Sequence, residues 1–350
     1  MAAYRGGKTA GCQPCTGPSA YCPLPAAYLA FEGGHTVEER RWPRVAVLGA
    51  GAVGCYFGGM LARAGAPVTL IGHPPHVEAI TRHGLFFDGL HFQQYIPVSA
   101  STQASAACDA EIVLLCVKTL NTEEAAKSLV PHLAPGAALL SLQNGVDNVE
   151  RIRSAAGIDA FAGVVYVAVA MTAPGRVKHS GRGELILGDL PGRAREDGQR
   201  QAQLERIASL FERAGVPSPV SGNLEGELWV KMIINCAYNA VSALGRAHYQ
   251  RAGNNRWARA VMVKATEEAL GVARAAGVRL PEIDMVETVL GISESMANAT
   301  SSMAQDLGRG KRTEIDSLNG YLVRRGAEVG VATPVNQTLH ALVKLLEESV

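Results

Sequence analysis

Apolar residues fill nearly every position of the segment 226–244, GELWVKMIINCAYNAVSAL. The segment contains good helix formers and no proline, so it predicts a buried helix. Three polar side chains interrupt the apolar surface at a spacing of four residues, which places them on one face of the helix: Lys231, Asn235 and Asn239. Because an unpaired buried amide or ammonium is costly, this polar stripe predicts either a structural polar network or a substrate cleft with a catalytic lysine.

Short apolar runs alternate with helical patterns between residues 44 and 222. This alternation is typical of a doubly wound α/β sheet. The strands are expected at Val45–Leu48, Val68–Ile71, Ala110–Val117, Ala137–Leu142 and Phe161–Ala170, with a pair of strands between Arg176 and Gly188. Helices are expected after the first strand and at Thr122–His132 and Glu196–Ala214.

The second half of the chain has helical patterns only. The proline-, glycine- and serine-rich segment 216–223 predicts the boundary between the two halves. Besides the helix at 226–244, helices are expected at Asn255–Ala276, Glu282–Met296, from about Ser301, at Glu314–Val329 and at Pro334–Glu348. The predicted architecture is α/β, with an N-terminal Rossmann-like doubly wound sheet at 44–222 and an all-helical C-terminal domain at 223–350. Residues 1–43 show no sustained period and are expected to be a disordered extension.

A glycine-rich turn follows the first strand directly. Its residues are Gly49, Ala50, Gly51, Ala52, Val53 and Gly54. A GxGxxG pattern between a strand and a helix predicts a dinucleotide site, because glycine lets the backbone approach a pyrophosphate and the helix N-terminus attracts its charge. The second strand ends at His73 without a carboxylate for the ribose hydroxyls of NAD, which favours NADP.

Two polar residues stand at the ends of later strands. Lys118 follows the strand at 110–117, and Asn144 follows the strand at 137–142. Ligands of open α/β sheets bind outside the carboxyl ends of the strands, so both side chains are candidates for ligand contacts. A solvated loop lysine and a simple turn asparagine remain the alternatives.

The composition excludes several classes of protein. A net charge of +1 over 350 residues gives no electrostatic footprint for nucleic acid or for a membrane surface. The longest apolar run of the body, Phe161–Ala170, is too short to span a bilayer. Four of the seven cysteines lie in apolar stretches, which indicates the reducing cytoplasm. Cys12 and Cys15 form a single CxxC without a second pair, so no metal site is predicted.

Six motifs, taken in this order, resemble the ketopantoate reductase family: GAGAVG from Gly49, CVK ending at Lys118, QNG from Gln143, PGRVKHSGRG from Pro174, KMIINCAYN from Lys231 and SSMAQDLGRGKRTEID from Ser301. The resemblance covers residues 44–348. It implies NADPH-dependent reduction of 2-dehydropantoate (ketopantoate) to (R)-pantoate in pantothenate biosynthesis. Two positions depart from the family pattern, because His73 replaces a common arginine and Tyr249 stands near a further asparagine of some members.

The resemblance also implies roles for individual residues. The catalytic lysine of the family falls on Lys231 and its active-site glutamate on Glu314. Substrate contacts fall on Asn235, Asn239, Ser302 and Asn144, and cofactor contacts on Gly49–Gly54, His73, Lys118, Asn144 and Glu314.

Reduction of a ketone requires a hydride from a nicotinamide and a proton from a positioned acid. Lys231 is the expected acid, and Glu314 is expected to hold it charged or to contact the substrate hydroxyl. Ser302 is expected to bind the substrate, although Ser301 and Ser302 could instead cap a helix. The expected partner is a small keto acid, with a homodimer as a possible assembly. A reductase of another 2-keto acid and a non-catalytic NADP-sensing regulator are the alternative functions.

Overall fold

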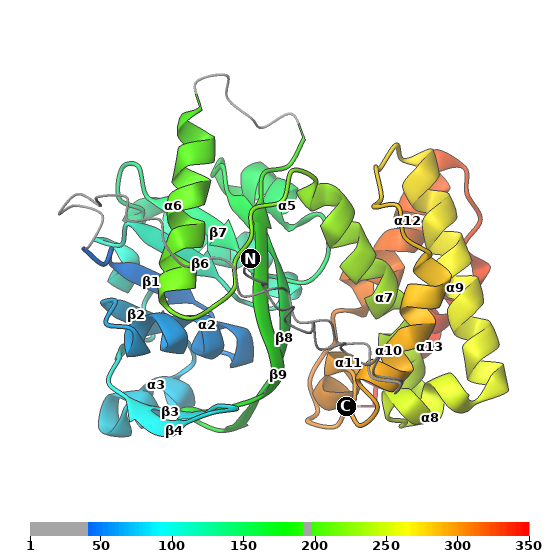
Figure 1. Cartoon of the computed structure of the whole chain (residues 1–350), viewed down its shortest axis with the longest axis horizontal. Coiled ribbons are helices and arrows are strands. Elements are labelled where there is room, and N and C mark those ends of the chain that lie inside the picture. Colours follow the sequence, from blue (N-terminus) through cyan, green and yellow to red (C-terminus); the bar gives the residue numbers. More distant parts are fainter. Residues whose placement is uncertain (1–40, 192–197, 350) are drawn as a thin grey trace, which may run out of the picture. The chain divides into compact units, whose positions relative to one another are not determined.

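Nine strands form a single sheet in the computed structural model, which describes residues 41–191 and 198–349 (Figure 1). Six of the strands are parallel neighbours in the order β5-β2-β1-β6-β7-β8. Their bounds are β1 Val45–Leu48, β2 Val68–Ile71, β5 Ser99–Ser101, β6 Ile112–Leu115, β7 Ala138–Ser141 and β8 Phe161–Ala173. This is the strand order of a dinucleotide-binding fold, and the direction of winding reverses between β1 and β6. The predicted doubly wound sheet is therefore confirmed.

Three further strands extend the sheet beyond β8. The strand β9, Arg176–Gly188, pairs antiparallel with β8, and β3, Leu85–Asp88, pairs parallel with β9 and antiparallel with β4, Gln93–Ile96. The expected pair of strands between residues 176 and 188 is wrong, because this segment is one continuous strand. Its glycines break the apolar pattern without ending the strand, since Gly183 is taken up in a β-bulge opposite Tyr166 and Val167.

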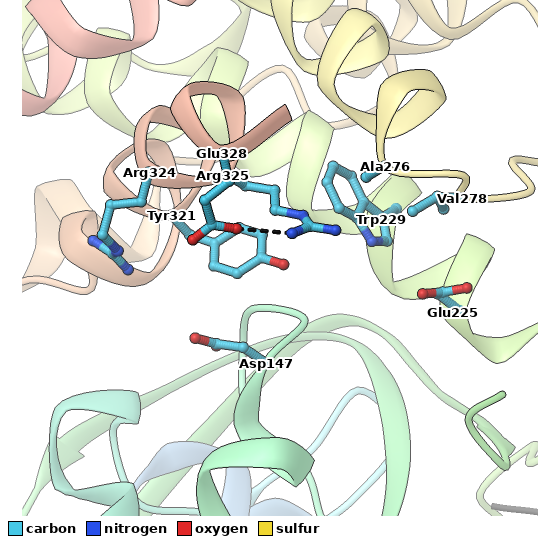
Figure 2. Close-up of a pocket in the computed structure, with 9 residues that line it drawn as sticks. All are labelled: Asp147, Glu225, Trp229, Ala276, Val278, Tyr321, Arg324, Arg325 and Glu328. Atoms are coloured by element: carbon cyan, nitrogen blue, oxygen red, sulfur yellow. Dashed lines mark hydrogen bonds and ion pairs between the residues drawn. The ribbon is translucent and has the colours of Figure 1, made fainter. Parts of the chain in front are cut away.

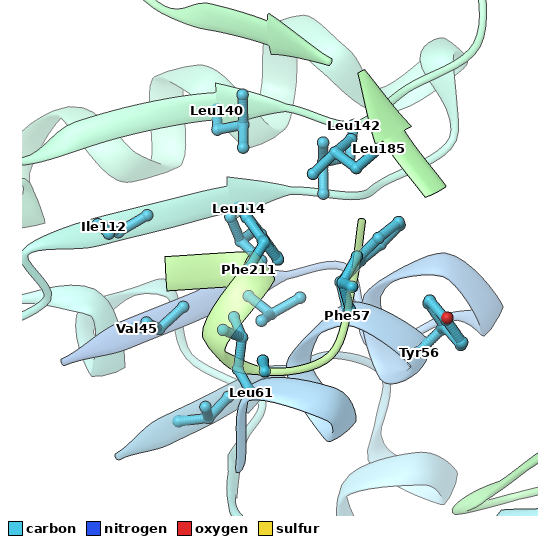
Figure 3. Packing of buried hydrophobic residues seen from close by; sticks show 14 of the residues in the cluster. Val45, Tyr56, Phe57, Leu61, Ile112, Leu114, Leu140, Leu142, Leu185 and Phe211 are labelled. Atoms are coloured by element: carbon cyan, nitrogen blue, oxygen red, sulfur yellow. The ribbon is translucent and has the colours of Figure 1, made fainter. Parts of the chain in front are cut away.

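Helices cover both faces of the sheet. On one face α2, Ala52–Arg63, and α6, Gln199–Arg213, share an apolar cluster with Val45 and Val47 of β1, and Figure 3 shows part of this cluster. On the other face α4, Thr122–Leu129, and α5, Asn148–Ala156, share a second apolar cluster with Ala46 and Leu48. Successive residues of β1 thus point to opposite apolar layers, which explains why its sequence is continuously hydrophobic. Four further elements complete this half: α3 Pro74–His83, η1 Ala104–Ala107, η2 Thr119–Asn121 and η3 Val130–His132.

The long helix α7, Leu224–Gly245, lies at the centre of the helical half. Asn223 caps it by accepting a hydrogen bond from the Gly226 backbone nitrogen, and Glu225 and Glu227 in the first turn complement the helix dipole. Fourteen residues of α7 are buried, and eleven of them belong to the apolar clusters of the helical half or of the sheet. The other helices are α8 Tyr249–Asn254, α9 Arg256–Ala275, α10 Met285–Ser295, α11 Ser302–Leu307, α12 Asn319–Val329 and α13 Pro334–Glu347.

One helix boundary differs from the prediction in a way that matters for function. The expected helix Glu314–Val329 starts only at Asn319, because Leu318 leaves the helical region with φ −111° and ψ −99°. Glu314 precedes a short 3₁₀ turn, η4 Ile315–Ser317, and is not a residue of the helix.

Two other expectations concern membranes and boundaries. No helix within 41–191 or 198–349 is both long and apolar enough to cross a bilayer. The expected disorder of residues 1–43 falls almost entirely on residues outside the described part of the chain. The domain boundary at residue 222 stays a prediction.

Candidate active site

In the glycine turn between β1 and α2, one glycine has room for a Cβ atom and two others have none. A Cβ atom on Gly49, which has φ +112°, would lie 2.6 Å from the Cys116 carbonyl carbon, and one on Gly54 would lie 2.1 Å from the Gly49 oxygen. Gly51 is exposed at the N-cap of α2, and nothing lies within 4 Å of its Cβ position. No side chain caps α2, and no acidic residue stands in its first turn. Open space at an uncapped helix N-terminus fits the pyrophosphate of a dinucleotide.

His73 lies at the end of β2 on the same side of the fold. Its side chain is exposed, and its backbone is the N-cap of α3 without a side-chain capping bond. The first turn of α3 contains no acidic residue. Its position therefore suits an anion, although a neutral imidazole is a weaker partner for a phosphate than an arginine.

A carboxylate from the helical half occupies the carboxyl end of the sheet. Glu314 is 5% exposed, and its Oε1 accepts hydrogen bonds from the backbone nitrogen and the hydroxyl of Thr119, both at 3.0 Å. Its Oε2 accepts a hydrogen bond from the side-chain amide of Asn144 at 2.9 Å. Lys118 Nζ lies 3.7 Å from the same Oε2 and 2.7 Å from Asp306 Oδ2. The structure thus brings Lys118, Asn144 and Glu314 together, and their roles in a common site stay predictions.

Charge and burial act in opposite directions on this carboxylate. Burial favours the neutral acid, but the Lys118 ammonium and the hydrogen bonds from Thr119 and Asn144 hold the pKa of Glu314 below its usual range. Burial also disfavours the charged form of Lys118, but Glu314 and Asp306 raise its pKa overall. The pKa of Asp306 is raised, mainly because burial outweighs the attraction of Lys118. At neutral pH Lys118 and Glu314 are therefore charged.

Lys231 extends from the middle of α7 toward β8. It is half-buried, and its Nζ lies 5.9 Å from the centroid of the Tyr166 ring. This ammonium has no hydrogen bond or ion pair with any residue in the described ranges. Burial lowers the pKa of Lys231 to about 8; Glu314 opposes this change and Arg182 adds to it. An amine without a partner and with a pKa near neutrality is suited to giving a proton to a ligand.

The remaining predicted substrate residues lie on α7 and at the start of α11. Asn235 is half-buried and Asn239 is 2% exposed, and neither carboxamide bonds to a described residue. Ser301 caps α11 by accepting a hydrogen bond from the Ala304 nitrogen, and its hydroxyl donates to the Asn239 carbonyl. The capping role thus belongs to Ser301, whereas Ser302 is exposed and is not the cap. The roles in substrate binding stay predictions.

Four residues near these groups were not predicted as site residues. Thr119 bonds to Glu314 and Asp306 to Lys118, Tyr166 stands beside Lys231, and Arg182 stacks on the Tyr166 ring. Thr119 could have been found, because it directly follows Lys118 at the end of β6. Arg182 and Asp306 lie within two of the quoted motifs, but the contacts of all three join residues far apart in the sequence, which no periodic pattern reveals.

A separate hollow of about 310 Å³ contains none of the predicted site residues (Figure 2). Asp147, ahead of α5, faces Tyr321 and Arg325 of α12 across it, and Trp229 of α7 closes one side. Arg325 is paired with Glu328 at 2.8 Å. Within the described ranges no group of three histidine, cysteine, aspartate or glutamate residues could hold a metal ion, and Cys12 and Cys15 lie outside these ranges.

Comparisons with known proteins agree with the motifs. Residues 45–192 match the family model "Ketopantoate reductase PanE/ApbA", and residues 223–347 match "Ketopantoate reductase PanE/ApbA C terminal". A 2-dehydropantoate 2-reductase of Pyrococcus abyssi is 32% identical over 303 residues, which cover 86% of this chain and 97% of the relative.

Two solved structures have the same fold over the same length. The PanE/ApbA family ketopantoate reductase of Ralstonia eutropha is 47% identical, with a TM-score of 0.81 over 87% of this chain and 99% of the other. A D-mandelate dehydrogenase in a ternary structure with NADH and anilino(oxo)acetate is 26% identical, with a TM-score of 0.79 over 87% and 99%. The two family models together span most of the sheet and helical halves, and the chain therefore belongs to the ketopantoate reductase family of oxidoreductases.

Proposed function

We propose that this protein reduces 2-dehydropantoate to (R)-pantoate with NADPH, as a step of pantothenate biosynthesis, and that Lys231 is the general acid. The observation that carries the proposal is the unpaired Lys231 ammonium, whose pKa is lowered to about 8 on a helix that faces β8. A relative named 2-dehydropantoate 2-reductase that matches 86% of the chain supports this choice of substrate.

The chain has residues that fit a dinucleotide. The open position at Gly51 suits the pyrophosphate, Lys118 and Asn144 lie at the carboxyl ends of β6 and β7, and His73 suits the 2′-phosphate that distinguishes NADPH. When bound, the nicotinamide supplies the hydride for the keto carbon. Glu314 contacts Asn144 and Lys118, so it positions residues that are proposed to contact the cofactor as well as the substrate.

Lys231 supplies the proton. Its ammonium is attracted to the oxygen of the substrate carbonyl, stabilises the negative charge that develops there, and then donates the proton to that oxygen. A pKa of about 8 keeps most of Lys231 protonated at pH 7 while making it a stronger acid than an exposed lysine. The charge on Glu314 keeps this pKa from falling further.

The polar groups around Lys231 orient the substrate. Asn235 and Asn239 lie one and two helical turns after Lys231 on the same face, and their carboxamides are unpaired among the described residues. Ser302 and Asn144 complete the proposed substrate contacts. Their mixture of donors and acceptors matches a carboxylate and a hydroxyl, which both occur in 2-dehydropantoate.

Steady-state kinetics test the proposal. Purified protein is assayed with 2-dehydropantoate, once with NADPH and once with NADH, by following the absorbance of the reduced nucleotide. We expect saturable turnover and a higher kcat/KM with NADPH. Absence of turnover with either nucleotide would refute the proposed activity, and a higher kcat/KM with NADH would refute the NADPH preference alone.

A second function, reduction of a different 2-keto acid, is favoured by one specific observation. The D-mandelate dehydrogenase neighbour was solved with anilino(oxo)acetate and shares the fold at a TM-score of 0.79. The aromatic ring of Tyr166 beside Lys231 could pack on an aromatic substrate. Assays of phenylglyoxylate in parallel with 2-dehydropantoate separate the two substrates by kcat/KM. A non-catalytic NADP sensor would bind the nucleotide and turn over neither.

The possible homodimer stays a prediction. The molar mass measured in solution by light scattering would decide it.

A further inference from the structure

Arg182 has an unusual backbone conformation. Its φ is +53°, in the left-handed region that residues with a Cβ rarely adopt, and it stands between Gly181 and Gly183 in β9. A glycine would adopt this conformation without strain. The backbone conformation alone therefore does not explain why position 182 holds an arginine. Residues with a strained backbone, especially at bulges, often belong to functional sites.

The bulge holds the Arg182 side chain against β8. Glu184 pairs with Tyr166 and Arg182 with Val167 across the two strands, so Gly183 has no partner. The guanidinium carbon of Arg182 lies 4.1 Å from the centroid of the Tyr166 ring, and Arg182 Nε donates to Glu184 Oε2 at 2.9 Å. Its two terminal nitrogens bond to none of the described residues, and the side chain of Arg182 is 48% exposed. One edge of the guanidinium is thus fixed, and the other edge is free.

The proposed acid lies near the same aromatic ring as Arg182. Lys231 Nζ is 5.9 Å from the centroid of the Tyr166 ring, and the Arg182 guanidinium carbon is 4.1 Å from it. The two cationic groups can therefore be no farther apart than the sum of these two distances. The positive charge of Arg182 also contributes to the lowered pKa of Lys231. Arg182 keeps one unbonded guanidinium edge and Lys231 has no partner among the described residues, so together they offer N–H donors beside one aromatic ring to an anionic ligand.

We propose that Arg182 binds the carboxylate of the 2-keto acid whose carbonyl oxygen is protonated by Lys231. The proposal rests on the proposed function and adds the residue that selects an acid over a neutral ketone. A 2-keto acid has its carboxylate on the carbon next to the carbonyl, so it offers acceptors to two neighbouring cations at once. A guanidinium suits this role, because its paired N–H groups match a carboxylate and its charge does not depend on pH.

Several carboxylates lie around the pair, among them Glu184 and Glu227 near the Tyr166 hydroxyl. Glu184 is bound to Arg182 Nε, and Glu314 is bound to Thr119, Asn144 and Lys118. Burial, with Glu227 and Glu184 nearby, raises the pKa of Tyr166 to about 12, so its hydroxyl stays neutral at neutral pH. Among the described cations of this region, Arg182 and Lys231 have N–H donors left for an anionic ligand.

The test compares variants of Arg182 with substrates that differ in charge. Arg182→Gln and Arg182→Lys keep a Cβ at the strained position, so they leave the backbone cost unchanged. Arg176→Gln is the matched control, because Arg176 lies on the same strand and also stacks on a ring, that of Phe86 at 4.3 Å, outside the proposed site. Each protein is assayed with 2-dehydropantoate and with its neutral lactone, as a substrate or as an inhibitor.

We expect Arg182→Gln to raise the KM for 2-dehydropantoate by about 10–100-fold, the usual scale for one charge-assisted bidentate contact. The KM or inhibition constant of the lactone should change little. The preference of the enzyme for the acid over the lactone should therefore fall by a similar factor. Arg182→Lys should recover part of the preference, and Arg176→Gln should behave as the wild type. Equal losses for acid and lactone would show a structural role and overturn the proposal, as would no change for either.

The proposal can fail separately from the proposed function. If the wild type turns over no 2-keto acid, titration calorimetry of 2-dehydropantoate in the presence of NADP⁺ replaces the assay. Binding that weakens in Arg182→Gln but not in Arg176→Gln would support the carboxylate contact even then. Equal binding in both variants, or no binding to the wild type, would overturn it.

Discussion

The carboxylate of Glu314 accepts two hydrogen bonds from Thr119, although the two residues are 195 positions apart in the chain. Thr119 follows β6 at the point where the sheet reverses its winding, and Glu314 comes from the segment between α11 and α12. Both bonds are 3.0 Å long, and the side chain of Glu314 is buried. This contact therefore joins the end of the sheet to the helical half and holds a charge beside Lys118 and Asn144.

Replacing the proposed acid should affect chemistry more than nucleotide binding. We expect Lys231→Ala to lower kcat by about 10²–10⁴-fold, the usual contribution of a general acid. The dissociation constant for NADPH, measured by fluorescence titration, should stay near that of the wild type. Lys264→Ala is the control, since Lys264 is an exposed lysine of the same half, paired with Glu267. Unchanged turnover in Lys231→Ala would remove Lys231 from the acid role.

The pH dependence follows from the lowered pKa of Lys231. Keto acid reduction needs the protonated ammonium, which predominates below a pKa of about 8 and disappears above it. We therefore expect kcat/KM for reduction to be level below this pH and to fall about tenfold per pH unit well above it. The pH–rate profile of the wild type checks this. A profile that stays level up to the range of an ordinary lysine would contradict the assignment.

Neutralising Glu314 should change both the pKa of Lys231 and the affinity for the substrate. The negative charge of Glu314 raises the pKa of Lys231, so Glu314→Gln should move the alkaline limb of the profile to lower pH. Glu314→Ala should raise the KM for the keto acid, and a wild-type KM in this variant would count against a substrate contact.

The same residue should matter for stability. Glu314→Ala leaves the buried Thr119 donors and the Asn144 amide without their acceptor. We expect the free energy of unfolding to fall by about 1–3 kcal/mol, the usual cost of unsatisfied buried groups. Urea denaturation followed by circular dichroism measures this. Glu328→Ala serves as a comparison, because Glu328 is 61% exposed in its pair with Arg325 and should lose little.

Two glycines of the same turn should respond differently to alanine. A Cβ on Gly51 meets no atom within 4 Å, whereas a Cβ on Gly54 would lie 2.1 Å from a backbone oxygen. Gly51→Ala should therefore keep the melting temperature and weaken NADPH binding, because the methyl group takes the space proposed for the pyrophosphate. Gly54→Ala should lower the melting temperature markedly. Thermal melts measure the change in melting temperature, and nucleotide titrations measure the change in NADPH affinity. An unaltered NADPH affinity in Gly51→Ala would mean that the pyrophosphate binds elsewhere.

The sequence by itself determined the fold class and most elements. β1 and β2 were predicted to the residue, because a buried parallel strand is a continuous apolar run between turn residues. The glycine turn was equally clear, since the GxGxxG pattern stands between a strand and a helix, and the structure leaves no room for a Cβ at Gly49 and Gly54. The helix α7 and its polar stripe followed from a period of 3.6 residues.

The tertiary structure alone decided how the site is assembled. Glu314 was expected on a helix, but it lies before a 3₁₀ turn and reaches Thr119 across 195 residues, a pairing that no local pattern encodes. The bulge that holds Arg182 over Tyr166 was likewise hidden, because glycines in a strand look the same in sequence whether they end it or bend it. Local periodicity reports which face of an element is buried. The partners of a buried charge depend on where other elements pack, and that information exists only once the chain has folded.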